Sequence, residues 1–202
     1  MPGLCRSPRL SSRGVNVTPV QPTRKPIRQW MLLGAVVLLT IILDQLSKAY
    51  VVAHLDLYES WMPLDWVEPY FRFTHIRNTG AAFGIFPEGN MIFSIIAVIV
   101  SMMIVYYYRQ LPSEAWLVRM ALGLQLGGAL GNLVDRIRQG YVVDFLHLEH
   151  WPVSNVADIS IVMGVVLLTY EVFREERRMN KQKAEAVNQD NSVDSSEEEA
   201  LC

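Results

Sequence analysis

Four long apolar segments constrain the fold of this 202-residue chain more than any other feature of its sequence. They cover about residues 30–54, 91–108, 115–135 and 152–173, and the second of them contains no charged side chain. About 20 apolar residues cross the hydrocarbon core of a bilayer, where a helix satisfies its own backbone polar groups. The sequence therefore predicts a mainly α membrane protein, built as a four-transmembrane-helix bundle.

The segments around the apolar runs differ sharply in charge. Residues 1–28 are rich in Pro, Arg and Ser and carry six basic side chains and no acidic one, whereas all the charged side chains after Lys183 are acidic. This composition predicts a disordered basic cytoplasmic arm at 1–28, a membrane domain at 29–174 and a charged, disordered cytoplasmic tail at 175–202. Positive charge beside a membrane span explains the arm more simply than nucleic-acid binding. A cleavable signal peptide is disfavoured because the first apolar run is too long and no small-residue cleavage site follows it.

The distribution of Lys and Arg predicts the orientation of the spans, because cytoplasmic segments carry an excess of these residues. The arm holds six of them and the segment after the fourth span holds five, whereas the loop from residue 53 to 90 holds only Arg72 and Arg77. We therefore expect a multi-pass protein with both termini in the cytoplasm and this loop outside.

Both outer loops contain strand-like patterns. Residues 70–77 alternate with a period of two, and the turn residues 78–80 (Asn-Thr-Gly) follow them. Residues 141–148 are also strand-like. These patterns predict a small extracytoplasmic β-rich loop region, in which Trp61 and Trp66 suit the headgroup level of a membrane.

Polar residues that are costly in lipid gather at the outer ends of three spans, where a functional site is the default hypothesis. The candidates are Asp44, Lys48, Asn132, Asp135, Asn155 and Asp158, together with Asn78 in the first outer loop. Gly123, Gly127 and Gly131 form a stripe that leads to Asp135 on the third span. Because small residues let a second helix approach closely, this stripe predicts tight packing beside the polar cluster.

The residue types limit the chemistry of such a site. Cys5 and Cys202 lie in opposite tails, the four histidines lack metal-ligand spacing, and the sequence contains no phosphate loop or nucleophile elbow. We therefore expect no metal and no cofactor. Two carboxylates in a poorly hydrated site share a proton, so one can act as a base on water while the other donates to a carbonyl oxygen. Such a pair would hydrolyse an amide bond.

Other interpretations stay open at this point. The aspartates could pair only with Arg136, Arg138 and Lys48, or the chain could be a membrane scaffold without activity. Buried carboxylates could also relay protons in a small transporter or channel. Clustering of the acids at one interface speaks against a path across the membrane, and a scaffold leaves the convergence of Asn, Asp and Arg residues unexplained.

Five short motifs occur in order along the chain. They are Asp44-Gln-Leu-Ser-Lys48, Asn78-Thr-Gly-Ala-Ala-Phe83, Gly131-Asn-Leu-Val-Asp-Arg136, Val142-Val-Asp-Phe145 and Asn155-Val-Ala-Asp158. Over about residues 30–173, this series resembles the sequence boxes of the bacterial lipoprotein signal peptidases, the signal peptidase II family. The resemblance implies an aspartic endopeptidase of the cell inner membrane, with its active site near the outer leaflet. Such an enzyme cleaves the signal peptide from diacylglyceryl-cysteine prolipoproteins.

The resemblance also implies roles for single residues. By the family pattern, Asp144 and Asp158 are the catalytic pair and Asp135 supports them. The residues that match polar positions lining the substrate site are Asn78, Asn132, Arg136 and Asn155. Asp44 and Lys48 match a supporting pair.

Partners follow from the same resemblance, namely prolipoprotein substrates and membrane lipids, and we expect a monomer without a nucleic-acid partner. The sequence departs from the family at Ser154, where an aromatic residue usually precedes the last Asn. This change could alter packing beside the catalytic helix, but it leaves Asn155 and Asp158 in place.

Overall fold

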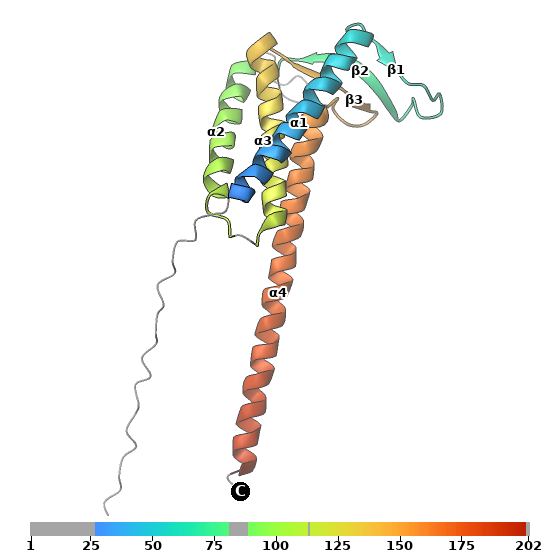
Figure 1. The fold of residues 1–202 in the computed structure, drawn as a ribbon. Coiled ribbons are helices and arrows are strands. Elements are labelled where there is room, and N and C mark those ends of the chain that lie inside the picture. The colour runs from blue at the N-terminus through green and yellow to red at the C-terminus, as the bar shows by residue number, and fades with distance from the viewer. Residues whose placement is uncertain (1–26, 81–88, 113, 201–202) are drawn as a thin grey trace, which may run out of the picture.

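A computed structural model of the chain describes residues 27–80, 89–112 and 114–200. Within these residues the chain forms four long helices and a small antiparallel sheet (Figure 1). The helices are α1 (Ile27–His54), α2 (Asn90–Tyr108), α3 (Trp116–Gln139) and α4 (Val156–Ala200). All four are long and apolar enough to cross a membrane, so the predicted four-span bundle is confirmed within the described residues.

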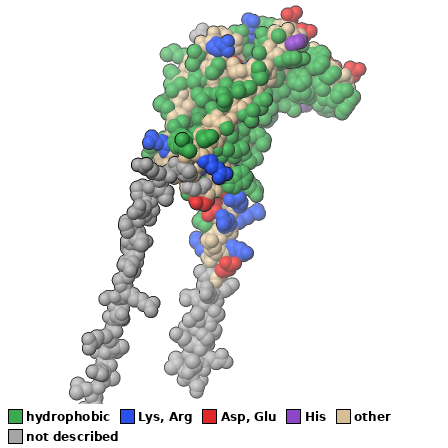
Figure 2. Space-filling view, viewed as in Figure 1, with side chains coloured by type: hydrophobic (Ala, Val, Ile, Leu, Met, Phe, Trp, Pro, Cys, Tyr) green, Lys and Arg blue, Asp and Glu red, His purple; other side chains and the backbone are tan. Residues whose placement is uncertain are grey.

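The outer surface of the bundle is apolar, as a lipid environment requires. Large hydrophobic side chains such as Leu38, Ile42 and Met102 are more than 40% exposed. Figure 2 shows such side chains covering the bundle, with Lys and Arg gathered where α4 leaves it. In water this surface would be costly, whereas in lipid it is the favourable one.

The most buried of the four spans is α3, which contacts each of the others. Its glycine stripe faces α1: a methyl group added at Gly127 would lie 2.7 Å from Thr40 Cβ, and one at Gly131 would lie 2.8 Å from Asp44 Oδ2. Gly128, on the adjoining face, packs against Ala157 of α4. The stripe therefore brings the helices close together, as predicted from its spacing.

The sheet lies beside the end of the bundle where α1 and α3 finish and α4 begins, which we call the sheet end (Figure 1). Its strands are β1 (Ser60–Trp61), β2 (Phe71–Asn78) and β3 (Val142–Leu148), in the order β1-β2-β3. Both predicted strands are therefore present. Gly140, at a left-handed φ of 80°, ends α3 and turns the chain directly into β3.

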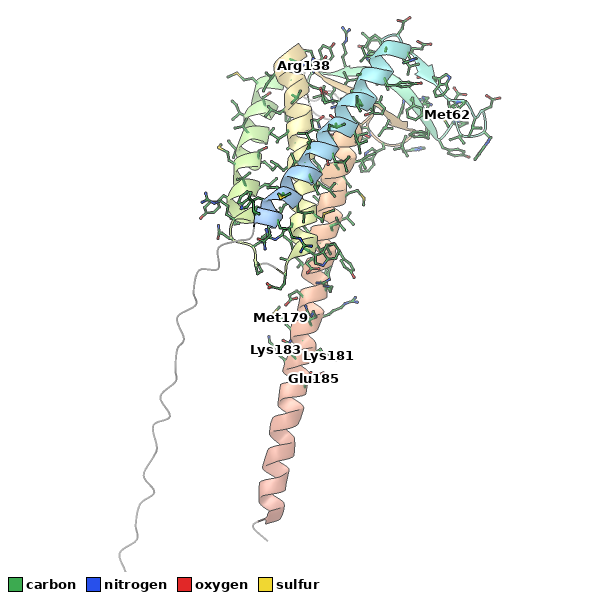
Figure 3. All side chains as sticks on the ribbon, in the orientation of Figure 1. Met62, Arg138, Met179, Lys181, Lys183 and Glu185 are labelled. Carbon is green, nitrogen blue, oxygen red and sulfur yellow. The ribbon has the colours of Figure 1, made fainter. Side chains whose placement is uncertain are left out.

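In the structure α4 continues through residue 175 to Ala200, as a helix in the segment for which the composition predicts disorder. The sequence after Gly164 contains neither Gly nor Pro and is rich in good helix formers. Arg174 pairs with Glu171 at 2.7 Å, one turn away on the same helix. In Figure 3 the labelled residues Lys181, Lys183 and Glu185 lie beyond the ends of the other three helices. Residues 1–26 of the predicted arm lie outside the described residues.

Candidate active site

Residues far apart in the sequence form one hydrogen-bonded cluster at the sheet end. It contains Asp44, Lys48, Asn78, Asn132, Asp135, Asp144, Asn155 and Asp158, all of which were candidates from the sequence. Six of them are buried, with Asp44 and Asn155 fully inaccessible to solvent. The predicted convergence is therefore present. Residues 81–83 of the Asn78 motif lie outside the described residues.

Asp158 is fixed by the hydrogen bonds that begin α4. The backbone N–H of Asp158 donates to Asn155 Oδ1 at 3.0 Å, and the backbone N–H of Asn155 donates to Asp158 Oδ2 at 3.2 Å. This reciprocal pair is a capping box with Asn155 as the N-cap. The other carboxylate oxygen of Asp158 accepts a bond of 2.8 Å from Asn132 Nδ2. Both oxygens of Asp158 therefore have fixed donors.

Asp144 lies on β3 and is held by two amides. Asn78 Nδ2 of β2 donates to its Oδ2 at 2.8 Å, and Asn155 Nδ2 donates to its Oδ1 at 2.7 Å. The Gly80 N–H bonds Asn78 Oδ1 at 3.0 Å and so sets which way the Asn78 amide faces. Asn155 thus contacts both carboxylates, Asp144 with its side chain and Asp158 with its backbone.

Burial, followed by the nearby charge of Asp158, raises the pKa of Asp144 to about 7. The hydrogen bonds from Asn78 and Asn155 act in the opposite direction, because they stabilise the ionised carboxylate. Two carboxyl groups that share a poorly hydrated site and bind one proton between them near neutral pH can supply an acid and a base together.

Lys48 forms a separate ion cluster beneath this pair. Its Nζ lies 2.8 Å from Asp44 Oδ2, 2.8 Å from Asp135 Oδ2 and 3.0 Å from Asn132 Oδ1. Asp44 also accepts the backbone N–H of Ala157 at 3.0 Å, so the cluster joins α1, α3 and α4. Two of the aspartates therefore pair with a cation.

Asp144 and Asp158 are different, because within the described residues they form no ion pair and their side chains accept bonds from amides. The interpretation that all the aspartates only balance basic residues is therefore wrong for this pair. Sequence reasoning from the residues alone did not separate these two aspartates from the others.

The amide of Asn132 connects the two groups. Because Lys48 can only donate, Asn132 Oδ1 must face it, and Asn155 Nδ2 donates to the same oxygen at 3.1 Å. Asn132 Nδ2 then necessarily faces Asp158. Lys48 and Asn155 thus together fix the orientation of an amide that contacts Asp158.

Arg136 lies beside the cluster and is only weakly tethered. Its Nη1 is 3.5 Å from the backbone oxygen of Asn132, and its guanidinium lies 5.7 Å from the ring centre of Phe93 on α2. It forms no ion pair among the residues that the structure describes. Most of its N–H groups therefore have no acceptor among the described residues.

Gln45 is a member of the cluster that sequence reasoning missed. Its Nε2 donates to Asp135 Oδ1 at 2.9 Å and to Asp44 Oδ2 at 3.2 Å, so it bridges the two carboxylates around Lys48. Its position inside the first motif was the available signal. Phe93, whose ring faces Arg136, had no signal in the sequence, since it is one apolar residue among many on α2.

Ser154 contacts β3 through its backbone. Its carbonyl accepts the N–H groups of Phe145 and Leu146, each at 2.8 Å. These bonds join the chain before α4 to the strand that carries Asp144 and do not use the Ser154 side chain. The departure from the aromatic residue therefore leaves this connection intact.

No group of three or more His, Cys, Asp or Glu side chains suited to a metal ion occurs within the described residues.

Comparisons with known proteins cover most of the bundle. The family model described as Signal peptidase (SPase) II matches residues 36–174. The lipoprotein signal peptidase of Moorella thermoacetica is 44% identical over 135 residues, which are 67% of this chain and 88% of the relative. That of Halothermothrix orenii is 44% identical over 143 residues, which are 70% of this chain and 95% of the relative.

Two solved structures, both described as bacterial membrane enzymes, have similar folds. One has a TM-score of 0.64 at 27% identity, over 71% of this chain and 88% of its own. The other has a TM-score of 0.60 at 28% identity, over 69% of this chain and 91% of its own.

Proposed function

The chain belongs to the signal peptidase II family, and from this premise we propose that its reaction is carried out by Asp144 and Asp158. As a member, it is a multi-pass membrane peptidase that removes signal peptides from prolipoproteins. The peptide bond that it hydrolyses must be activated by side chains of the protein. The two aspartates are the candidates because they alone among the clustered acids lack a cationic partner within the described residues.

In the proposed reaction the pair starts with one proton. The ionised carboxylate takes a proton from water while the oxygen of that water bonds to the scissile carbonyl carbon. The protonated carboxyl donates to the carbonyl oxygen, which gives a tetrahedral intermediate. Collapse of the intermediate breaks the C–N bond, and the proton held by the base passes to the leaving amine. As the C=O bond re-forms, one hydroxyl of the intermediate returns its proton to the other carboxylate, so the pair again holds one proton. Because the pKa of Asp144 is raised to about 7, the singly protonated pair is available near neutral pH.

The observation that carries this proposal is the position of Asn155. Its side-chain amide bonds Asp144 at 2.7 Å and its backbone N–H bonds Asp158 at 3.2 Å. One residue therefore holds both carboxylates from fixed directions, which leaves neither free to turn toward a cation. Fixed donors of this kind cost no reorganisation during the reaction.

We assign the remaining residues to binding and support. Asn78 and Asn132 each bond one catalytic carboxylate, and Arg136 is suited to orient a substrate carbonyl by a charge-assisted hydrogen bond. Asp44, Lys48 and Asp135 hold the helices in register beneath them. The peptidase domain is then residues 29–174, flanked by a basic arm and a charged tail.

We propose that the substrate carries a diacylglyceryl group on the cysteine after the scissile bond, and that the enzyme acts as a monomer. The orientation follows from the Lys and Arg distribution: both termini are cytoplasmic, and the sheet end lies near the outer leaflet of the inner membrane. Reporter fusions after Arg109 and after Lys183 should both score as cytoplasmic. A periplasmic signal at either point would contradict this topology.

Conversion of each carboxyl to an amide tests the catalytic pair. Asp144→Asn and Asp158→Asn should each abolish cleavage of a purified lipid-modified prolipoprotein, and the double variant should be no worse, because groups that act as a unit are not additive. Asp135→Asn is the control, with a smaller loss of activity. All variants should insert into the membrane, and a chelator should leave the rate unchanged. Cleavage at the parent rate by Asp158→Asn would refute the two-aspartate mechanism.

A further inference from the structure

A cavity that neither catalytic aspartate lines lies between the last turns of α1 and the sheet. Its volume is about 470 Å³. The floor is formed by Val51 and Leu55 of α1, and each strand contributes one aromatic ring, from Trp61, Phe73 and Phe145. The rings form a row across the sheet, with centroids 6.2 Å apart for the first two and 6.5 Å apart for the last two. The lining is therefore largely apolar.

The cavity and the catalytic aspartate lie on opposite faces of β3. Phe145 lines the cavity and directly follows Asp144 in the strand, where successive side chains point to opposite sides. Both residues are buried. A molecule in the cavity would therefore touch the strand that carries Asp144 without touching the carboxylate.

The mouth of the cavity is continuous with the membrane-facing surface of α1. Tyr50 lines the cavity and is 65% exposed, and Trp61 is 53% exposed. The neighbouring side chain of Leu46, one turn before Tyr50 on the same helix, is also exposed, at 64%. Figure 2 shows hydrophobic side chains continuing from the bundle onto the sheet. Since α1 is long and apolar enough to span a membrane, lipid chains can reach this mouth along its exposed surface.

From this continuity we propose that the cavity binds one acyl chain of a bilayer phospholipid. The polar side chains of the lining, Ser47, Tyr50 and His54, all lie on α1. A peptide segment against the three aromatic rings would therefore leave most of its backbone N–H and C=O groups without partners, whereas an acyl chain has no polar groups to bury. Trp61 and Tyr50 at the mouth suit the level of the lipid headgroups. Occupancy places the chain beneath Phe145 and so stabilises the position of β3.

The acyl chain in the cavity is that of a bulk lipid and not of the substrate. The acyl chains of a substrate hang from the cysteine next to the bond that is cut, and that bond must reach Asp144 on the other face of β3. This distinction rests on the proposed catalytic role of Asp144, whereas the lipid site itself does not.

Photo-crosslinking tests the site without using activity. The full-length protein is reconstituted in vesicles of phosphatidylethanolamine and phosphatidylglycerol that contain a phospholipid with a diazirine at one chain end. After irradiation, adducts mapped by mass spectrometry should concentrate on residues 47–61 and on Phe145. Equal labelling of these residues and of exposed positions such as Leu39 and Ile42 would show only a general lipid coat and overturn the proposal.

Two variants of α1 sharpen the test. Val51→Phe fills the cavity and should remove most of the adducts there, whereas Leu43→Phe, on an exposed part of the same helix, should keep them. If Val51→Phe fails to fold, the labelling pattern of the parent protein still decides. Displacement of the adducts by an added lipid-modified precursor would overturn the proposal in favour of a substrate chain. An inactive but normally labelled Asp144→Asn variant separates this site from the catalytic one.

Discussion

Replacement of Lys48 by methionine should disturb both stability and catalysis, for separable reasons. The change removes a buried ammonium group that lies 2.8 Å from each of two buried carboxylates, Asp44 and Asp135. Removing one partner from a buried ion pair costs about 3–5 kcal/mol, because the remaining charge stays buried without compensation. At about 2–4 °C per kcal/mol for a domain of this size, the melting temperature should fall by about 6–20 °C.

The effect on catalysis arises through Asn132. Without Lys48, only the 3.1 Å bond from Asn155 Nδ2 holds Asn132 Oδ1 in this direction, and a flipped amide would point its oxygen at the Asp158 carboxylate. A hydrogen bond to a charged group contributes about 1.5–3 kcal/mol, so losing it should slow cleavage about 10- to 150-fold. Thermal unfolding in detergent and cleavage of a lipid-modified prolipoprotein measure the two effects.

A double variant distinguishes the two causes. Lys48→Met with Asp135→Asn removes the excess buried charge, so it should regain part of the lost stability while cleavage stays slow. Lys181→Met, on an exposed part of α4, is the matched control and should change neither property. If Lys48→Met melts and cleaves like the parent, the ion cluster has no such role. If the double variant recovers full activity, Lys48 does not set the orientation of Asn132.

Four further predictions concern pH, Arg136 and the lipid of the substrate. The pKa of Asp144 is raised from 3.8 to about 7, so cleavage should decline as the pH rises through about 7. Asn78→Ala removes a hydrogen bond that favours the ionised form of Asp144, so it should move this decline to higher pH. The raised pKa of Asp144 also affects stability: protonation of Asp144 stabilises the folded protein fully below pH 3.8, and this stabilisation is lost as the pH rises through about 7. The melting temperature should therefore fall across that pH range. Arg136→Lys should insert into the membrane normally but lose activity in the cleavage assay, since lysine lacks the planar fork of N–H donors in the guanidinium group. Full activity of this variant would show that the fork is not used. A precursor without the lipid should be cut poorly, because chain burial at about 0.8 kcal/mol per methylene helps to hold the scissile bond at the interface; equal rates for both precursors would exclude this contribution.

The sequence predicted most of the framework because each element carries a strong local signal. Apolar runs defined the spans, the alternation in residues 70–77 marked β2, and the stripe ending at Gly131 indicated where helices meet. The tail carries two opposing signals: its polarity predicts disorder, whereas its helix formers and its lack of Gly and Pro favour the continuous α4 of the structure.

The division of labour among the aspartates could not be predicted from spacing. Asp44 and Asp135 bind Lys48, while Asp144 and Asp158 bind amides, and this difference depends on which helices touch. The resemblance to a family chose the same pair by motif, which remains a prediction about catalysis. The apolar cavity also had no signal, because Val51, Trp61 and Phe145 meet only after the sheet folds against α1.

The capping box at the start of α4 ties the active site to the end of a helix, which is ordinarily the part of a helix that frays first. The bonds between Asn155 and Asp158 both open the helix and aim the carboxylate. Unwinding of that single turn would therefore dismantle the site while the rest of the bundle stayed intact. The fraction of competent enzyme at any moment is then set by a local helix–coil equilibrium, and amide hydrogen exchange at residues 155–158 should report it.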